Sequence, residues 1–254
     1  MTDMIAPEHD FRVERVAAPL RHSVTESIRY AIALGRYKAG DRLPERELCA
    51  MTGVSRTLVR EALRQLESEG IIKVLPHRGP VVAEVTVEQA EGIYQVRIEL
   101  EGLACQLFAE RASSAQLDAL VQAFEKLKAS LQHEEPLSRL RAKNFFYDCL
   151  IAGAANEALG TSLRMLNARV MLLRATSLRA PGRSADSVAE LAELIDALKQ
   201  RDGKRARRAA ATHVRNAAKT AIAILKSTQE SEQPASRAPN RRKTSARVSH
   251  KLSR

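Results

Sequence analysis

The chain has 254 residues, more than one typical domain and fewer than three. Aromatic residues make up 4% of it and Trp is absent, a composition typical of helices packed through small aliphatic side chains. The formal net charge is +11, but residues 1–85 carry 13 Lys and Arg against 12 Asp and Glu, so net charge alone does not make this part a nucleic-acid-binding unit.

Cysteine usage and missing motifs exclude several protein classes. Cys49, Cys105 and Cys149 are odd in number and far apart, which argues against a disulfide framework and against a zinc finger. The N-terminus lacks the basic and apolar regions of a signal peptide, and no run of about 18 apolar residues occurs. Nucleophile elbows, phosphate loops and dinucleotide fingerprints are also absent. We therefore expect a cytoplasmic protein that does not enter a membrane and is not an enzyme.

The N-terminal part predicts three helices followed by a β-hairpin. Hydrophobic periodicity and turn signals give helices at 20–34, 45–52 and 56–69 and strands at 71–75 and 80–85. This element order is that of a winged helix-turn-helix. We expect it to occupy residues 19–85, after an N-terminal arm of residues 1–18.

The third helix has two distinct faces on a helical wheel. One continuous arc is apolar and predicts the core face: Leu58, Val59, Ala62, Leu63 and Leu66. Arg56, Arg60 and Arg64 form a stripe beside it, since residues four apart share one side of a helix. Such a stripe suits a DNA major groove, where Arg donates two hydrogen bonds to guanine. A solvated helix face is the alternative, because Glu61, Glu67 and Glu69 lie nearby.

Motifs in this part resemble the DNA-binding domain of the GntR family. They are Leu43 to Leu48, Gly53 to Leu63, Leu66-Glu67, Glu69-Gly70 and Arg78-Gly79, and the resemblance spans about residues 19–85. It implies that Arg46, Arg56 and Arg60 contact DNA, that Ser55 and Thr57 contact its backbone, and that Gly79 lies at the tip of the wing. The full candidate DNA-contacting set is Arg46, Ser55, Arg56, Thr57, Arg60, Arg64, His77, Arg78 and Gly79.

Residues 86–227 predict an all-helical unit. No strand signal occurs there, and amphipathic segments are interrupted at five places that contain Ser, Pro, Gly or Asp. About six helices result, enough for a bundle with an interior. The expected fold class is mainly α, with a winged helix-turn-helix followed by this bundle.

Residues 93–226 resemble the FCD domain of the FadR subfamily. The resemblance rests on Arg97 to Glu101, Phe146 to Asn156 and Glu190 to Val214. It implies a domain that dimerises and binds a small-molecule effector. Many members of the subfamily hold a metal with one Asp and three His, and those positions are Lys143, Tyr147, Leu191 and His213 here. Three of the four ligands are missing, so we expect no metal and no other cofactor.

The altered positions predict an effector site of a different kind. Lys143 shares an apolar helix face with Phe146 and Tyr147, where a buried amine needs a partner. An anionic effector such as a carboxylate is one such partner. The alternative is that Lys143 reaches solvent or pairs with a core carboxylate such as Glu101. The candidate effector-binding residues are Arg97, Lys143, Tyr147, Leu191 and His213.

The C-terminal residues 228–254 have almost no apolar content, so we expect them to be disordered. Together these features predict a homodimeric transcription regulator, a repressor that binds a short inverted repeat in double-stranded DNA. The competing hypothesis is a basic architectural protein that coats DNA through the charged tail and has no effector.

Overall fold

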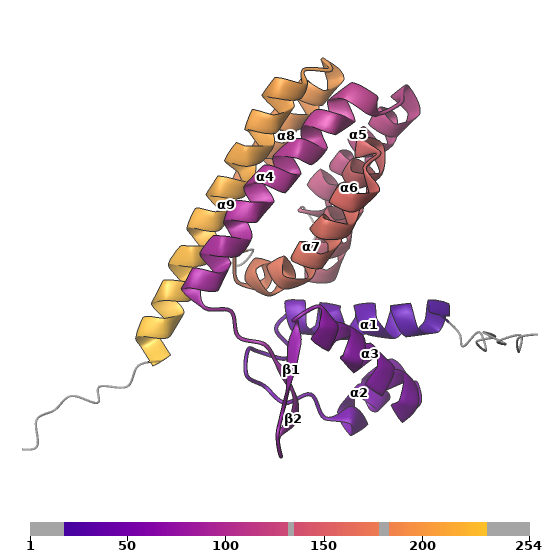
Figure 1. Cartoon of the computed structure of the whole chain (residues 1–254), viewed down its shortest axis with the longest axis vertical. Helices are drawn as coiled ribbons and strands as arrows, with labels where there is room; N and C mark the ends of the chain where they lie inside the picture. Colours follow the sequence, from indigo (N-terminus) through magenta and orange to yellow (C-terminus); the bar gives the residue numbers. More distant parts are fainter. Residues whose placement is uncertain (1–17, 132–134, 178–182, 233–254) are drawn as a thin grey trace, which may run out of the picture.

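The computed structural model describes residues 18–131, 135–177 and 183–232, which form a winged helix-turn-helix and a helical bundle (Figure 1). The expected N-terminal arm lies outside the described residues except for Ala18. The elements of the winged domain are α1 (Ala18–Ala33), α2 (Glu45–Thr52), α3 (Arg56–Ser68), β1 (Ile72–Leu75) and β2 (Gly79–Val82).

The turn between α2 and α3 has local causes in the sequence. Gly53 ends α2 with a left-handed φ of 71°, and its N–H donates to the Cys49 carbonyl. Ser55 begins α3 as its N-cap, where its Oγ accepts from the Leu58 N–H at 3.5 Å. The winged domain then closes over one hydrophobic core, whose most buried members are Ile28, Leu43, Leu48, Val59, Ala62, Leu66, Ile71 and Ile72.

The hairpin is anchored to the segment before α2. β1 and β2 pair antiparallel, with Leu75 opposite Gly79 at the turn. The Gly40 N–H donates to the Val82 carbonyl at 3.0 Å, and Arg42 forms an isolated bridge with Val81. These bonds fix the wing relative to the start of α2, because both are tied to the same short segment.

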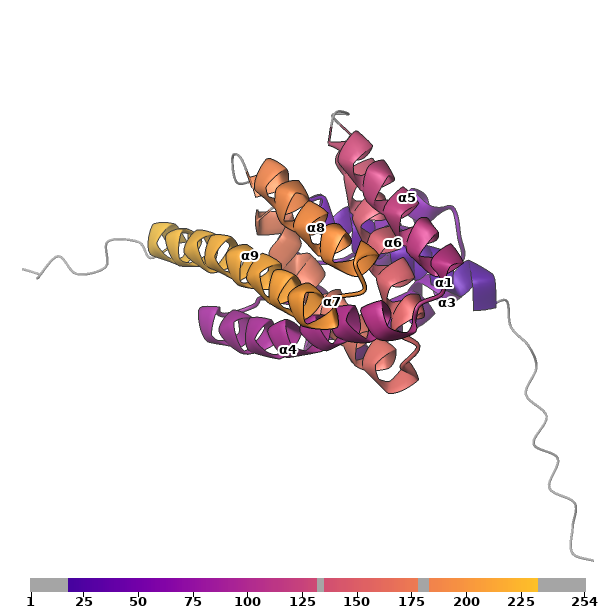
Figure 2. The same ribbon diagram turned by 90° about the horizontal axis from the view of Figure 1, so that it is seen from above.

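Among the described residues, six helices follow the wing: α4 (Val87–Arg111), α5 (Ser114–Ser130), α6 (Pro136–Ala154), α7 (Glu157–Ser177), α8 (Arg183–Lys199) and α9 (Gly203–Glu232). Thr86 and Gln89 form a capping box at the start of α4, and Ser113 and Gln116 form another at α5. In two perpendicular views α4 and α9 lie side by side, with α8 against α9 (Figures 1 and 2). The expected fold class, including a bundle of about six helices, is confirmed.

The bundle core is closely packed where α6 meets α4. Phe108 of α4 and Phe146 of α6 are both fully buried. A Cβ atom at Gly153 would lie 2.2 Å from the Phe108 ring, far inside van der Waals contact. Glycine at position 153 is therefore what lets the end of α6 lie against this ring.

The winged domain packs against α6 and α7 through α1. The Tyr30 ring lies under the Arg141 guanidinium, with 5.6 Å from Cζ to the ring centroid. Leu140 and Met171 are buried in a cluster with residues of α1, and Leu172 packs on the core of the winged domain. Apolar packing across this junction therefore fixes the position of the winged domain against the bundle.

One predicted boundary is wrong. The segment expected to lack structure was placed at 228–254, but α9 continues to Glu232. A helix that is already packed can extend through Thr, Gln and Glu without a new nucleation step, so loss of apolar content does not end it. Residues 233–254 lie outside the described residues, and the prediction for them stays untested.

Candidate DNA-contacting surface and buried polar cluster

The arginine stripe of α3 is exposed, as the sequence predicts. Arg56, Arg60 and Arg64 are all exposed, and so is Thr57. On the other side of the helix lie the buried residues Val59, Ala62, Leu63 and Leu66, whereas Leu58 is half-buried. The core arc therefore turns the stripe away from the protein.

Helix α2 adds residues to the same region. Arg46, a predicted contact, is exposed near the start of α2. Its neighbour Glu45 accepts a hydrogen bond from Arg60 Nε at 2.8 Å. This bond lowers the pKa of Glu45, and the charges of Arg60 and Arg56 act in the same direction. Sequence reasoning missed Glu45, because a first-turn acid is ordinary at a helix start and nothing local shows that it meets Arg60.

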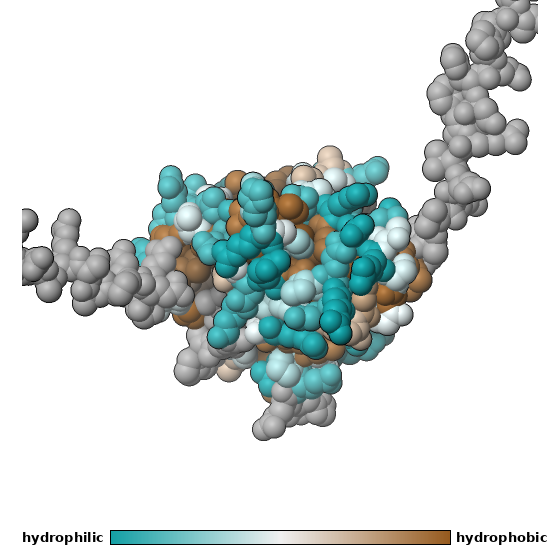
Figure 3. Space-filling model, turned by 90° about the horizontal axis from the view of Figure 1, so that it is seen from below, coloured by the Kyte–Doolittle hydropathy of each residue, from teal (hydrophilic) through white to brown (hydrophobic). Residues whose placement is uncertain are grey.

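The wing presents three predicted contacts at its turn. His77 and Arg78 are exposed, and His77 has a left-handed φ of 60°, unusual for a residue with a side chain. Gly79 is the first residue of β2 and also has a positive φ, 76°. The tip is therefore formed by residues 76–78, with Gly79 just after it. Seen from the side of the winged domain, most of the surface is hydrophilic (Figure 3).

A buried polar cluster lies inside the bundle, and four of the five candidate effector-binding residues belong to it or border it. Arg97 is 2% exposed, and its Nε donates to Glu101 at 2.6 Å one turn later on α4. Its guanidinium also lies 5.3 Å from the centre of the Tyr94 ring. Glu101 is itself buried, so the ion pair is shielded from solvent.

Lys143 and Tyr147 enter the same region from α6. Lys143 is 9% exposed and Tyr147 is buried with its ring edge-on to Phe146, 5.7 Å between centroids. The charge of Lys143 depresses the pKa of His213, which places the two groups near one another. Leu191, the fifth candidate, is a member of the apolar core and supplies no polar atom.

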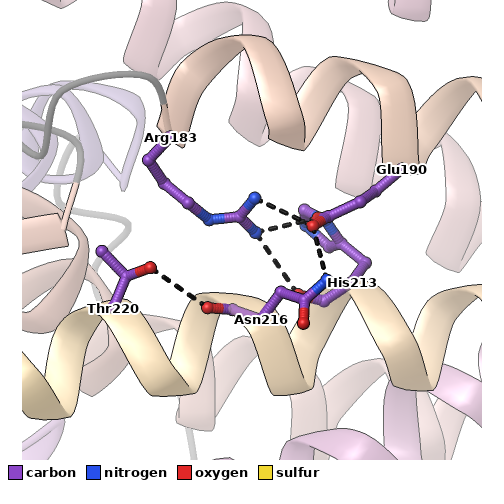
Figure 4. A network of polar contacts seen from close by, with 5 residues as sticks. All are labelled: Arg183, Glu190, His213, Asn216 and Thr220. Carbon is purple, nitrogen blue, oxygen red and sulfur yellow. Dashed lines mark hydrogen bonds and ion pairs between the residues drawn. The ribbon is translucent and has the colours of Figure 1, made fainter.

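His213 is held by a network that links α8 to α9 (Figure 4). Glu190 Oε2 lies 2.6 Å from His213 Nδ1, and Asn216 Nδ2 donates to Glu190 Oε1 at 2.8 Å. Arg183 donates to both Glu190 oxygens, at 3.0 and 2.9 Å, and to the His213 carbonyl. Sequence analysis did not identify Arg183, Glu190 and Asn216 as a group. Glu190 and His213 both lie in the segment from Glu190 to Val214 that resembles the FCD domain, and this was the one available signal.

The network determines how the His213 ring is protonated. Burial lowers the pKa of His213, Glu190 opposes this effect and the nearby Lys143 charge adds to it, and the result is a pKa of about 4. The imidazole is therefore neutral at pH 7, and Nδ1 carries the proton because a carboxylate only accepts. Nε2 is left as an acceptor, and it is buried without a hydrogen-bond partner among the described residues.

The residues present do not fit the metal site of the FadR subfamily. His213 is the single ligand kept, and an amine, a phenol and an isobutyl group stand at the other positions. Within residues 18–131, 135–177 and 183–232, no group of three or more His, Cys, Asp or Glu could hold a metal ion. A divalent ion normally needs three or four protein ligands, so one imidazole is insufficient.

A separate cleft of about 710 Å³ lies between the winged domain and the bundle. It contains none of the candidate effector-binding residues. Its wall on α6 includes Asn144 and Asp148, whereas Lys143 and Tyr147 face the bundle interior. Burial raises the pKa of Asp148, and the Arg164 charge opposes that rise. Helix α6 therefore separates the cleft from the buried polar cluster.

The cysteines have packing roles. All three are free thiols: Cys105 is fully buried in the bundle core, and Cys49 and Cys149 are half-buried against the two cores. Burial raises the pKa of Cys105 well above its usual range, which disfavours the reactive thiolate. In the part of the chain that the structure describes, no helix has the length and apolar character needed to cross a membrane.

Comparisons with known proteins agree with this architecture. Residues 20–82 match the model described as bacterial regulatory proteins, gntR family, and residues 92–216 match the FCD domain. A regulator from the TAR-I ttuE-ttuC' intergenic region of Agrobacterium vitis is 32% identical over 51% of this chain and 77% of its own length. A probable D-xylose utilization operon transcriptional repressor of Paenarthrobacter nicotinovorans is 28% identical over 75% and 84%.

The fold has a solved counterpart. The structure of Escherichia coli McbR/YncC superposes with a TM-score of 0.70 at 24% identity, covering 84% of this chain and all of that one. A likeness at this identity establishes the fold of the two units and does not transfer a ligand.

Proposed function

The chain belongs to the gntR family of bacterial regulatory proteins and carries an FCD domain, and we propose that it is a homodimeric repressor of a short inverted-repeat operator. Family membership makes it a DNA-binding transcription regulator with a small-molecule effector, and not an enzyme. The inverted repeat follows from symmetry, because a two-fold dimer presents two identical winged domains. Repression is supported by the name of the Paenarthrobacter relative.

The exposed arginine stripe of α3 is the observation that supports the DNA-binding proposal. We propose that Arg56 and Arg60 contact base edges, with Arg46 and Arg64 beside them. Ser55, Thr57 and the wing residues His77, Arg78 and Gly79 hold the DNA backbone and the adjacent groove. We also propose that residues 19–85 are the DNA-binding unit and residues 86–232 the effector-binding and dimerisation unit.

Selection of operators from a random duplex library tests this proposal. Wild type should enrich an inverted repeat, and light scattering should give twice the chain mass. Arg56→Ala or Arg60→Ala should cost ~1–3 kcal/mol of operator affinity and relax preference at one position in each half-site. Arg208→Ala on α9, which removes the same charge from an exposed position, is the control and should keep the preference. A monomer bound tightly to one half-site would contradict the dimer.

For the effector, we propose a carboxylate that binds the buried polar cluster directly, without a metal. Lys143 and Arg97 bring positive charge into the bundle interior, where an anion is stabilised more strongly than in water. Lys143 is the group we assign to the carboxylate, because it lies on the face of α6 that enters the buried polar cluster. The buried acceptor His213 Nε2 cannot bond the carboxylate, which only accepts, and would take a donor such as a hydroxyl group elsewhere on the effector.

Metal analysis and one variant test the effector proposal. Purified protein should contain no stoichiometric divalent metal, and Lys143→Met should abolish release of the operator by an acidic effector while operator binding persists. Lys126→Met, at an exposed amine on α5, is the control and should keep the response. One tightly held zinc or nickel per chain would contradict the proposal, because it would mean that other ligands rebuild the metal site.

A further inference from the structure

Glu45 is a negative charge placed beside the arginines of the candidate DNA-contacting surface. It is the first residue of α2, and its carboxylate accepts from Arg60 Nε across the helix-turn-helix at 2.8 Å. The Glu45 side chain is 31% exposed and that of Arg60 61%, so this pair lies at the surface. The charge of Arg56 also acts on Glu45, which places the carboxylate close to both arginines.

A carboxylate at this place is unfavourable for simple attraction to DNA. Phosphates repel it, and it cancels one of the charges that would otherwise release counterions. An exposed ion pair of this kind contributes little to stability, so folding alone does not explain it. Its effect on Arg60 is more specific.

The bond from Nε leaves the other end of the guanidinium available. Neither Nη atom of Arg60 has a hydrogen bond to another described residue. These two Nη groups form the fork that donates to guanine O6 and N7. Holding Nε restricts rotation of the long side chain, so less conformational entropy is lost when the fork meets a base.

We propose that Glu45 is a positioning residue for base recognition: it directs the two Nη groups of Arg60 toward a base and, by neutralising the guanidinium, disfavours phosphate binding by the same side chain. This inference rests on the proposed function, in which Arg60 reads a base. Glu45 therefore lowers the affinity for DNA of any sequence and raises the preference for the operator.

Binding to operator and non-operator duplexes over a salt series tests the proposal. Arg60→Ala first identifies the base pair whose preference depends on Arg60. Glu45→Ala should reduce the preference at that same base pair tenfold or more. It should also bind non-operator DNA more tightly, and its slope of log K against log salt should be steeper by about 0.9, as expected for one added phosphate contact.

Two further variants separate charge from position. Glu45→Gln keeps an acceptor oxygen without the charge, so it should steepen the salt slope as much as Glu45→Ala and lose less of the base preference. Glu47→Ala removes an exposed acid two residues along the same helix that has no bond to Arg60, and it should change neither quantity by a comparable amount.

The outcomes distinguish base recognition by Arg60 from the positioning of Arg60 by Glu45. If Arg60→Ala leaves every base preference unchanged, the assignment of Arg60 as a base reader is wrong, and the positioning role is wrong with it. If Arg60→Ala relaxes the preference and Glu45→Ala does not, only the positioning role is overturned. Equal steepening of the salt slope by Glu45→Ala and Glu47→Ala would likewise overturn it, since the effect would then be one of net charge.

Discussion

Glu190 is an ionised carboxylate that binds His213, Arg183 and Asn216 between α8 and α9. Burial by itself would raise its pKa, but hydrogen bonds from His213, Arg183 and Asn216 outweigh that effect and lower the pKa to about 2. At neutral pH the result is an ionised Glu190 carboxylate beside a neutral His213. Glu190 also orients the imidazole through the bond at Nδ1.

These two pKa values predict how stability depends on pH. The pKa of His213 falls from 6.5 to about 4 on folding, so the unfolded chain binds its proton more readily. The stability from a neutral His213 is fully present above pH 6.5 and is lost as the pH falls toward 4. The contribution of Glu190, with its pKa lowered from 4.5 to about 2, is lost next, below pH 4.5.

Urea unfolding measured at several pH values between 7 and 4 checks this expectation. As the pH is lowered, the free energy of unfolding should fall by up to about 1.4 kcal/mol per pH unit, because His213 takes up one proton when the chain unfolds. His213→Gln should flatten the profile in this window, whereas His77→Gln, at the exposed wing, should leave it unchanged. A profile that is equally steep in wild type and His213→Gln would contradict a depressed pKa for His213.

Helix α6 borders the bundle interior, the winged domain and the cleft between them. One side carries Lys143, Phe146 and Tyr147 into the bundle, and the other side carries Leu140 and Asn144 to the winged domain and the cleft. Helix α6 therefore contacts both the buried polar cluster and α1. Its position against α4 depends on Gly153.

Two glycine substitutions test how closely α6 packs. Gly153→Ala should lower the free energy of unfolding by ~1–3 kcal/mol, because the new methyl group overlaps the Phe108 ring. Gly92→Ala in α4 is the control, since no atom lies within 4 Å of its Cβ position. It should raise stability by up to about 1 kcal/mol through helix propensity. Chemical denaturation measures both, and a neutral Gly153→Ala would show that α6 lies farther from α4.

At the scale of the whole molecule, the C-terminal residues 233–254 carry an excess of positive charge outside the winged domain. Residues 233–254 contain seven Lys and Arg and no acid, while residues 1–85 carry 13 Lys and Arg against 12 Asp and Glu. The composition of this segment predicts no fixed fold, and we therefore expect its cations to pair with phosphates and not to read bases. We expect this segment to add affinity for any DNA sequence.

A chain that ends at Glu232 tests this expectation. The slope of log K against log salt should decrease by about 0.9 for each tail cation that contacts a phosphate, and the order of preference among operators should stay the same. A full-length variant with the seven Lys and Arg replaced by Gln is the control for chain length and should behave like the truncated chain. A changed order of preference would show that the segment contributes to specificity.

Local patterns in the sequence were sufficient to predict the fold and the candidate DNA-contacting residues of α3. The helices, the hairpin and the exposed stripe of Arg56, Arg60 and Arg64 follow from periodicity, caps and glycines, because these signals act within a few residues. The family resemblance likewise placed Lys143 and His213 in the interior. The end of α9 was misplaced because composition does not report how far a packed helix extends.

Contacts between distant residues were decided by the tertiary structure alone. Glu45 meets Arg60 15 residues later, and Glu190 meets His213 23 residues later, on different helices in both cases. No periodicity in one segment encodes such a meeting, because it depends on the angle and distance at which two helices pack. The sequence by itself therefore determined which elements form and which faces are buried, and the packing of those elements decided which charges meet and how the His213 ring is protonated.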